Sequence, residues 1–546
     1  MTQKSITCGE YLVKQLEAYG IDTIFGIPGV HTIELYRGLP QTNLKHITPR
    51  HEQGAGFMAD GYARVKGKPA ACFIITGPGM TNILTAMGQA YADSIPMLVI
   101  SSVNEVATLG MKQGRLHELY SQRDVVSGVC EFSHTVLCPS ELPEILAKAF
   151  TVFNSERPRP VHIEIPTDVI TKLVDLPLIT PGRLYRPEVS RAAIQDVTEI
   201  LKSAKNPYLL IGGGAINADS ESVIAIAEAF DMPVLYTVNG KGVFPPSHPL
   251  AIGSYQTTEI VREAILESDV VLAIGTELGE TDYDVAFNGE FKLNAKIIRV
   301  DIDPEQLHSN FLSTIGIVSD AKGFIDGLAA FIQISGIATK YASNSAGTLK
   351  VKAIKEALAT SFPKEWDVQH RVLEIIQKNA PNVVFAGDST QIVYSGNFLF
   401  ESEKTRKWFN SATGYGTLGY GLPAAIGAKI ANPEQPVVSL IGDGGIQFSL
   451  PELATAVEER IGIIVILWNN FGYQEIKRSM VNHGIPTIGV DIYTPDFLTI
   501  AKGFGCETIS INRMSELESA VLIAQRNDVP TILLLDEGEL YSEIEA

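Results

Sequence analysis

The stretch PVVSLIGDGGIQFSLPELATAVEERIGIIVILWNN, residues 436–470, decides the fold of this chain. An apolar run ends at Gly442, a helix-like segment follows at 450–459, and a second apolar run, 461–468, leads to Asn469 and Asn470. Runs that are apolar throughout indicate strands covered by helices on both faces of a parallel sheet. We therefore expect strand, helix and strand here, as in α/β proteins.

Polar residues follow both predicted strands directly. Asp443 directly follows the first strand, in a Gly-Asp-Gly turn, and Asn470 lies 27 positions later, after the second strand. Adjacent parallel strands bring such residues to one edge of the sheet, where ligands bind. Carboxylate and amide oxygens suit Mg²⁺ or Ca²⁺, and Gly444 and Gly445 allow backbone N–H groups to approach a phosphate. The sequence predicts a cation and phosphate site at this edge.

The same alternation of apolar run, Gly-rich turn and helix recurs along the whole chain. It is clear at 70–102, where a helix is expected to begin near Thr81, and again at 207–215 and 269–276. At roughly 150 residues per domain, 546 residues correspond to three or four domains. We predict an α/β protein with three doubly wound parallel-sheet domains.

Two segments have the composition of linkers. Residues 173–187 are rich in proline, and residues 338–348 are small and polar. They divide the chain into predicted domains at 1–175, 190–337 and 363–546.

Composition excludes several classes of function. Lys and Arg number 43 against 62 Asp and Glu, which gives a net charge of −19. A field of this sign repels phosphates, so no nucleic-acid partner is expected. No apolar run approaches the roughly 18–20 residues of a membrane span, so no membrane partner is expected either.

The expected location is cytoplasmic. The first ten residues lack a basic segment followed by an apolar one, as a secretory signal would have. The five cysteines are scattered, odd in number and without CxxC spacing, which favours reduced thiols and no cysteine-based metal site.

The GDG and NN pair, separated by a helix and a strand, resembles the thiamin diphosphate (ThDP) motif of the 2-oxo acid decarboxylase and acetolactate synthase superfamily. The segments GIPG at 26–29, RHEQGAGFMADGYAR at 50–64 and TGPGMTN at 76–82 are similar to its pyrimidine-binding domain. The resemblance implies a central domain next and a diphosphate-binding domain last.

The resemblance also implies roles for single residues. The side chains of Asp443 and Asn470 and the carbonyl of Gly472 correspond to the ligands of Mg²⁺. Glu52 corresponds to the carboxyl group that hydrogen-bonds the pyrimidine ring and promotes loss of the cofactor's thiazolium proton, which makes it the predicted catalytic acid.

Two further motifs complete the predicted cofactor site. GTLGYGLPAAIGA at 416–428 is similar to the region that bends ThDP, with Leu418 beneath the cofactor and the Gly416 carbonyl facing its amine. AGDSTQ at 386–391 supplies Ser389 and Gln391 to the diphosphate, together with the backbone of Gly444 and Gly445.

The sequence motifs define the reaction less closely than they define the cofactor. Pyruvate-type decarboxylases carry an Asp after the GxPG turn and a His-His pair. Here His31 follows Val30 at the turn, and the pair is reduced to His117 with Glu118. We predict that His31, His117 and Gln122 handle protons or position the substrate.

Two alternatives stay open. One is an acetolactate synthase-like carboligase that condenses two 2-oxo acids, and the other is a catalytically silent binding protein with the same fold. We do not expect FAD, which acetolactate synthases bind, because GGGAIN at 212–217 lacks the third Gly of GxGxxG and 237–250 does not resemble the FAD segment.

The segments at 26–39, 275–284, 469–478 and 489–497 together resemble the branch that decarboxylates 5-guanidino-2-oxopentanoate (2-ketoarginine). A guanidinium tail needs a carboxylate partner. Glu475 is the first candidate, beside Ile476, which stands where pyruvate-type enzymes have a Glu. The other candidate carboxylates are Glu118, Asp282 and Asp284.

The resemblance finally implies a homodimer or homotetramer. In this family the cofactor lies between two chains, so Glu52 of one chain and Asp443 of the other would share an active site.

Overall fold

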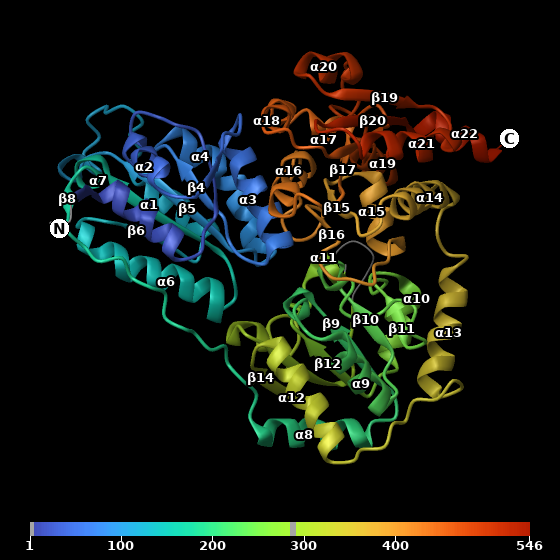
Figure 1. Cartoon of the computed structure of the whole chain (residues 1–546). Coiled ribbons are helices and arrows are strands. Elements are labelled where there is room, and N and C mark those ends of the chain that lie inside the picture. Colours follow the sequence, from blue (N-terminus) through green and yellow to red (C-terminus); the bar gives the residue numbers. More distant parts are fainter. Residues whose placement is uncertain (1–4, 284–290, 546) are drawn as a thin grey trace. The chain divides into compact units, whose positions relative to one another are not determined.

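The computed structural model describes residues 5–283 and 291–545 and contains three six-stranded sheets flanked by helices (Figure 1). The α/β prediction with three parallel-sheet domains is confirmed. The chain forms two compact units: Met1–Leu184, Ile375–Val393 and Asn410–Ala546 make the first, and Tyr185–Glu374 and Tyr394–Phe409 the second.

The first sheet lies near the amino terminus, in the first unit. Its strands are parallel and run, in spatial order, β3 (Lys45–Ile47), β2 (Thr23–Gly26), β4 (Ala71–Ile74), β5 (Met97–Val103), β7 (Pro160–Pro166) and β6 (Phe132–Thr135). The helices of this part are α1 (Cys8–Ala18), α2 (Ile33–Gly38), α3 (Glu52–Lys66), α4 (Pro78–Ala92), α5 (Gln122–Val126), α6 (Leu142–Ser155) and α7 (Thr167–Ile170). Strands β4, β5 and β7 are buried along their whole length, as expected for strands covered on both faces.

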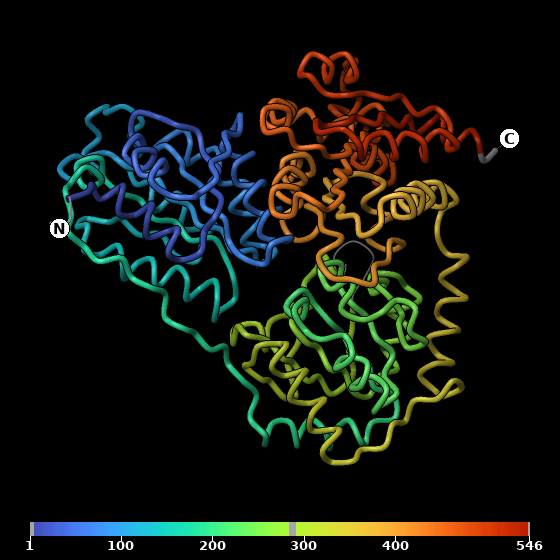
Figure 2. The backbone as a smooth tube through the Cα atoms, viewed as in Figure 1, coloured from blue at the N-terminus to red at the C-terminus, as the bar shows by residue number. Residues whose placement is uncertain are grey.

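The second sheet forms the core of the second unit. Its parallel strands run β11 (Ala251–Gly253), β10 (Val234–Tyr236), β9 (Pro207–Ile211), β12 (Val270–Ile274), β13 (Lys296–Asp301) and β14 (Ile315–Val318). The associated helices are α8 (Arg191–Ser203), α9 (Ser220–Phe230), α10 (Glu259–Leu266), α11 (Glu280–Tyr283), α12 (Ala321–Ile334) and α13 (Ala346–Leu358). Helix α14 (Lys364–Asn379) leads the chain out of this unit, as the tube in Figure 2 shows in yellow.

The third sheet contains the two apolar runs of residues 436–470 as neighbouring strands. Its strands run β16 (Trp408–Asn410), β15 (Val384–Gly387), β17 (Val437–Gly442), β18 (Ile464–Asn469), β20 (Thr531–Asp536) and β19 (Glu507–Ile511), and the last five are parallel. Its helices are α15 (Gln391–Leu399), α16 (Gly421–Ala431), α17 (Asp443–Ile446), α18 (Glu452–Glu458), α19 (Gln474–Asn482), α20 (Phe497–Phe504), α21 (Met514–Ala524) and α22 (Glu537–Glu545).

Local structure differs from the sequence expectation at three places. Helix α4 begins at Pro78, not near Thr81, because Gly77 takes a φ of +72° that turns the chain and proline suits the first helical turn. The segment 173–187 opens with a short strand, β8 (Leu173–Val174), which pairs antiparallel with β1 (Ile6–Thr7). The segment 338–348 ends inside α13. The domain boundaries themselves stay predictions.

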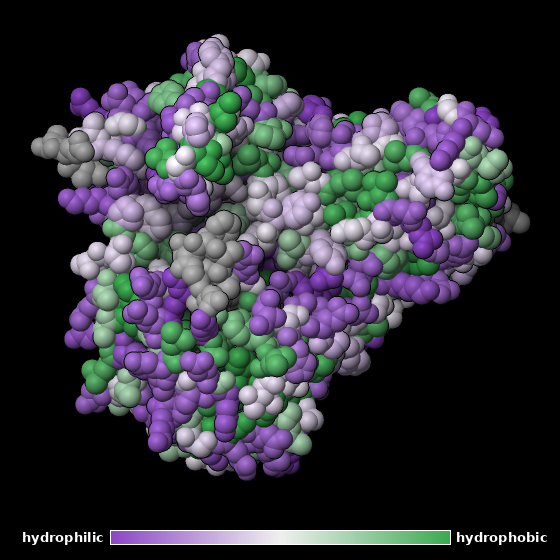
Figure 3. Space-filling model, turned by 180° about the vertical axis from the view of Figure 1, so that it is seen from behind, coloured by the Kyte–Doolittle hydropathy of each residue, from purple (hydrophilic) through white to green (hydrophobic). Residues whose placement is uncertain are grey.

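None of the helices within residues 5–283 and 291–545 has the length and hydropathy to cross a membrane. On the face drawn in Figure 3, apolar residues form separate patches among hydrophilic ones. All five cysteines, each within the described residues, are free thiols, and Cys138 is the exposed one.

Candidate active site

The predicted metal ligands lie at the carboxyl ends of two neighbouring strands. β17 and β18 pair in parallel, with Gly442 opposite Trp468, so Asp443 and Asn470 leave the sheet at the same edge. The backbone N–H of Gly472 donates to Oδ2 of Asp443 at 2.8 Å. The sequence prediction that these residues meet at one edge is confirmed.

The side-chain amide of Asn470 faces the oxygens of the other two residues. One terminal amide atom of Asn470 lies 3.1 Å from the carbonyl oxygen of Gly472 and 3.2 Å from Oδ1 of Asp443. If that atom is nitrogen, the amide donates to both neighbours. If it is oxygen, three acceptors face one another, and such an arrangement is favourable only around a cation. The donor set therefore fits a hard divalent metal.

Burial of Asp443 strengthens that fit. The side chain is 1% exposed. Desolvation raises the pKa of its carboxyl group, and the backbone N–H groups of Gly472 and Asn470 oppose that rise. Within the described residues, no group of three or more His, Cys, Asp or Glu side chains could hold a metal, so any cation here would rely on one carboxylate and neutral oxygens.

The residues predicted to bind the diphosphate differ in their contacts. Gly444 and Gly445 are buried, and a Cβ on Gly444 would meet the ring of Tyr473 at 2.6 Å. The hydroxyl of Ser389 lies 3.4 Å from that of Ser411. Gln391, in contrast, donates through Nε2 to Oε2 of Glu475 at 2.8 Å, which joins a predicted cofactor residue to the predicted substrate residue.

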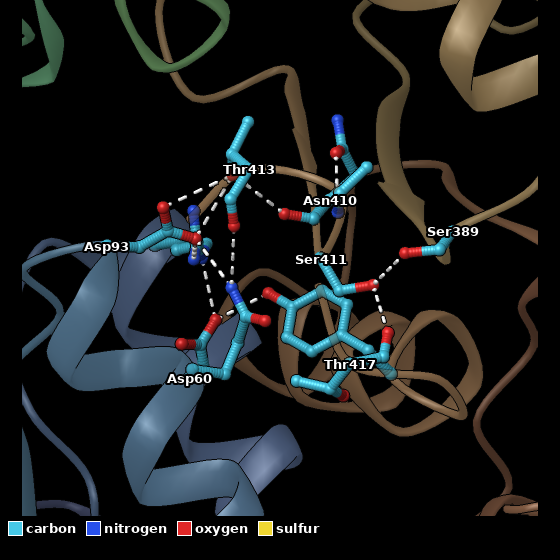
Figure 4. A network of polar contacts seen from close by, with 11 residues as sticks. Asp60, Asp93, Ser389, Asn410, Ser411, Thr413 and Thr417 are labelled. Carbon is cyan, nitrogen blue, oxygen red and sulfur yellow. Dashed lines mark hydrogen bonds and ion pairs between the residues drawn. The ribbon is translucent and has the colours of Figure 1, made fainter. Parts of the chain in front are cut away.

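The loop that carries Gly416 and Leu418 is held by helices of the first sheet. Thr413 donates to Asp93 and to the carbonyl of Asn410, and Ser411 donates to the carbonyl of Thr417 at 2.7 Å (Figure 4). Asp93 in turn pairs with Arg64 of α3 at 2.6 Å. These bonds fix the path of the loop through both parts of the first unit.

The tip of this loop is accessible. Gly416 is exposed, with a φ of +73°, and a Cβ added to it would have no atom within 4 Å. Leu418 is half-buried and outside the described hydrophobic core. A partly accessible aliphatic side chain on this loop is compatible with contact to a ligand.

Asp388 is a residue that the sequence reasoning missed. Its carboxylate accepts the backbone N–H groups of Ser389 and Gly419, both at 2.8 Å, and a Cβ on Gly445 would lie 3.1 Å from it. Burial raises the pKa of this carboxyl group to about 6. The available signal was an acid directly after an apolar strand ending in Gly, as at Gly442-Asp443.

Glu52 begins α3, where the chain emerges from strand β3. Asn82 of α4 donates through Nδ2 to Oε2 of Glu52 at 2.9 Å. The other oxygen, Oε1, faces Gly79, where a Cβ would lie only 3.2 Å away. In the part of the chain described, no hydrogen bond joins Glu52 to the Asp443 cluster, so within one chain these are two separate groups.

The structure brings two distant histidines together. The rings of His31 and His117 lie 5.3 Å apart, edge to face. The Nδ1 atom of each is buried and, within the described residues, has no hydrogen-bond partner. Burial, with a smaller effect of the charge of His117, lowers the pKa of His31. A Cβ on Gly77 would lie 2.6 Å from the His117 carbonyl, so the Gly-Pro-Gly turn approaches the pair closely.

Gln122 hydrogen-bonds several residues around the first sheet. Its side chain is buried and accepts from Thr76 at 2.9 Å and from the backbone of Gly77 at 3.0 Å, while its Nε2 donates to Ser101 at 3.0 Å and Glu164 at 2.9 Å. Its amide oxygen serves the turn that carries Gly77, and its amide nitrogen ties this turn to strands β5 and β7. We therefore place Gln122 beneath the histidine pair as a support of this turn.

The predicted substrate residues lie on the first turn of α19. Ile476 is 54% exposed, and Glu475 is also accessible beside it, 3.6 Å from Arg478. Glu118 is occupied by the backbone N–H groups of Gln113 and Arg115 in its own loop. Among the remaining candidates, Asp282 belongs to the second unit, and Asp284 lies outside the described residues.

Comparison with known proteins covers most of the chain. Family models for the N-terminal, central and C-terminal domains of thiamine pyrophosphate enzymes match residues 6–125, 194–328 and 385–534. A protein of Pseudomonas aeruginosa named probable 2-ketoarginine decarboxylase AruI is 44% identical over 520 residues, 94% of this chain and 91% of that protein. The acetolactate synthase large subunit of Corynebacterium glutamicum is 32% identical, over 98% of this chain and 87% of that subunit. The large subunit of acetolactate synthase isozyme 1 of Escherichia coli is 31% identical, over 95% of this chain and 92% of that subunit.

Proposed function

This chain belongs to the thiamine pyrophosphate enzymes, and we propose that it catalyses the Mg²⁺-dependent, non-oxidative decarboxylation of 5-guanidino-2-oxopentanoate to 4-guanidinobutanal and CO₂. The observation that carries the proposal is the 44% identity, over nearly the whole chain, to a protein named for this activity. The accessible carboxylate of Glu475, on the turn after the predicted metal loop, gives the substrate tail a chemical partner.

Asp443, Asn470 and the carbonyl of Gly472 would hold the Mg²⁺, because the Asn470 amide lies within 3.2 Å of both the Asp443 carboxylate and the Gly472 carbonyl. Bound ThDP supplies the carbon nucleophile that adds to the 2-oxo group and the electron sink for loss of CO₂. Glu52 would hydrogen-bond the cofactor, with Asn82 fixing Oε2 and leaving Oε1 toward Gly79.

The histidine pair would supply the proton that replaces CO₂ in the product. His31 and His117 face each other with one unpaired nitrogen each, so a proton can reside on either ring. Burial lowers the pKa of His31, which favours the neutral form of that ring. A decarboxylase needs such a donor, whereas a carboligase must delay protonation until a second carbonyl compound adds.

Glu475 would bind the guanidinium group. A carboxylate and a guanidinium form paired, charge-assisted hydrogen bonds. Gln391 holds one oxygen of Glu475 at 2.8 Å, which limits the rotamers of that side chain. Ile476, exposed next to it, offers an apolar surface to the methylene groups of the substrate.

The second candidate function is an acetolactate synthase-like carboligation, which the 31–32% identity to acetolactate synthases supports. Incubation of the chain with ThDP, Mg²⁺ and either pyruvate or 5-guanidino-2-oxopentanoate separates the two. We expect 4-guanidinobutanal and CO₂ from the guanidino acid. Acetolactate from pyruvate, with no turnover of the guanidino acid, would overturn the proposal.

A further inference from the structure

Glu452 is a buried carboxylate that none of the predicted roles uses. It is the first residue of α18 and is 1% exposed. Its Oε1 accepts the backbone N–H groups of Arg50 and His51, both at 3.1 Å, and its Oε2 accepts from Thr455 at 2.8 Å. The two N–H groups belong to the residues immediately before Glu52.

We propose that Glu452 is a positioning residue, which fixes the backbone corner from which Glu52 projects and thereby sets the orientation of the Glu52 carboxyl group. This inference rests on the proposed role of Glu52 in activating the cofactor.

The chemistry of the contact explains how Glu452 can hold the backbone of Arg50 and His51 in place. A buried carboxylate is costly unless hydrogen bonds satisfy it, and backbone N–H groups at the start of a helix lack partners of their own. At the start of α3 each group satisfies the other, and the negative charge lies favourably at the positive end of the helix. Neither side can move without exposing an unpaired polar group.

A second observation shows that the corner is shaped around Glu452. A Cβ on Gly54, two residues after Glu52, would lie 2.1 Å from Oε1 of Glu452. Only glycine allows α3 to approach the carboxylate this closely. The contact therefore depends on both partners of the pair, and each can be changed separately.

The chain offers a matched control on the same helix. Glu458, the last residue of α18, contacts the side chain of Arg50 in an exposed ion pair, and its bond leaves the backbone of Arg50 untouched. Glu458→Gln removes a carboxylate from the same helix and the same partner residue without changing the backbone corner.

The test uses the full-length chain with ThDP and Mg²⁺. Two readouts are needed: backbone hydrogen exchange of residues 48–56, and deuterium exchange at C2 of the bound cofactor, measured by NMR after rapid quenching without substrate. For Glu452→Gln we expect faster backbone exchange and C2 exchange slowed about 10- to 100-fold, as small misplacements of a catalytic group cause. ThDP affinity should stay within about threefold, because the residues proposed to hold the metal and diphosphate are unchanged. Glu458→Gln should match the wild type.

Several outcomes would overturn the inference. C2 exchange at the wild-type rate in Glu452→Gln would do so, as would unprotected Arg50 and His51 amides in the wild-type chain, a measurement that needs no variant. If Glu452→Gln does not fold, Glu452→Asp, which retracts the charge by one methylene, and Gly54→Ala take its place. Wild-type exchange in Glu52→Gln would refute the proposed role of Glu52 itself, whereas slow exchange there and fast exchange in Glu452→Gln would refute the positioning role alone.

Discussion

At the scale of one residue, replacement of Glu475 tests whether the enzyme binds a guanidinium substrate through this side chain. Loss of its charge removes a charge-assisted pair worth about 1.5–3 kcal/mol, or roughly 10- to 150-fold in kcat/KM. We expect this loss in Glu475→Gln for 5-guanidino-2-oxopentanoate, while an uncharged 2-oxo acid of similar length is turned over as by the wild type. Steady-state kinetics with both substrates measure the difference. An equal loss for both would show that Glu475 does not contact the guanidinium.

Replacement of Asp443 tests the proposed metal site. Asp443→Asn keeps the shape of the side chain but removes the single carboxylate of the proposed metal ligands, so ThDP should no longer bind more tightly when Mg²⁺ is added. Calorimetric titration with and without EDTA measures this. Asp536→Asn is the control, because Asp536 ends the adjacent strand β20 and its carboxylate accepts the backbone N–H groups of Gly538 and Glu539 at the start of α22. Mg²⁺-dependent binding that survives in Asp443→Asn would contradict the assignment.

The proximity of Asp443 to Asn470 could be predicted from sequence because these residues directly follow two strands that are neighbours in the sheet. The contact between His31 and His117 could not, since it depends on the path of a long loop that brings the second ring back to the first turn. The contacts of Glu452 could not be predicted from sequence either. In the sequence it is one acid in an ordinary helix, and its partners are backbone groups some 400 positions away.

At the scale of elements, helices α3 and α16 pack with backbone almost in contact. A Cβ on Gly427 would lie 1.9 Å from the carbonyl oxygen of Met58. Gly427→Ala should therefore force the helices apart and lower the unfolding free energy by about 1–3 kcal/mol. Gly503→Ala in α20 has open space around the new methyl group and should raise stability by up to about 1 kcal/mol. Thermal unfolding monitored by circular dichroism compares both; an unchanged Tm in Gly427→Ala would contradict the packing.

Strands β5, β6 and β7 bury a histidine whose titration should be visible in stability. His162 lies between the hydroxyls of Ser101 and Ser133, at 2.8 and 2.7 Å, and burial lowers its pKa to about 3. The folded chain therefore keeps the ring neutral, whereas the unfolded chain binds a proton below about pH 6.5. Stability from this group is present above about pH 6.5 and is lost as pH falls toward 3, at up to about 1.4 kcal/mol per pH unit.

The variant His162→Gln should flatten that dependence, because glutamine can still bond both hydroxyls but does not titrate. Tm measured between about pH 4.5 and 7.5 should fall less steeply with acid than in the wild type. The comparison removes the contributions of neighbours such as Glu164, since they are present in both chains. Parallel Tm profiles would show that His162 is not buried in neutral form.

The elements themselves were the most predictable level of the fold. Continuous apolar runs marked the buried strands correctly, because both faces of each sheet are covered. Helix ends were less predictable, since they depend on backbone angles: the φ of Gly77 starts α4 at Pro78, three residues before the expected position. Interruptions such as β8 depend on a partner strand at the other end of the domain, which local composition does not reveal.

At the scale of the whole molecule, Glu52 and the Asp443 cluster are separate groups within one chain. Two apolar residues next to predicted site residues are exposed: Val30, before His31, at 65%, and Phe471, between Asn470 and Gly472, at 53%. Both features support the proposal that a second copy completes each site. The net charge of −19 did not indicate this arrangement, because recognition of the cofactor is proposed to rest on a metal and backbone groups.

Complementation between two inactive variants tests this assembly. In a dimer with shared sites, a Glu52→Gln chain paired with an Asp443→Ala chain has both defects in one site and none in the other. Random mixing makes half of the dimers hybrids, so co-expression should restore about a quarter of wild-type decarboxylation. The two variants purified separately and mixed without subunit exchange provide the baseline. If co-expression restores nothing although mass spectrometry shows the hybrid dimer, each site lies within a single chain.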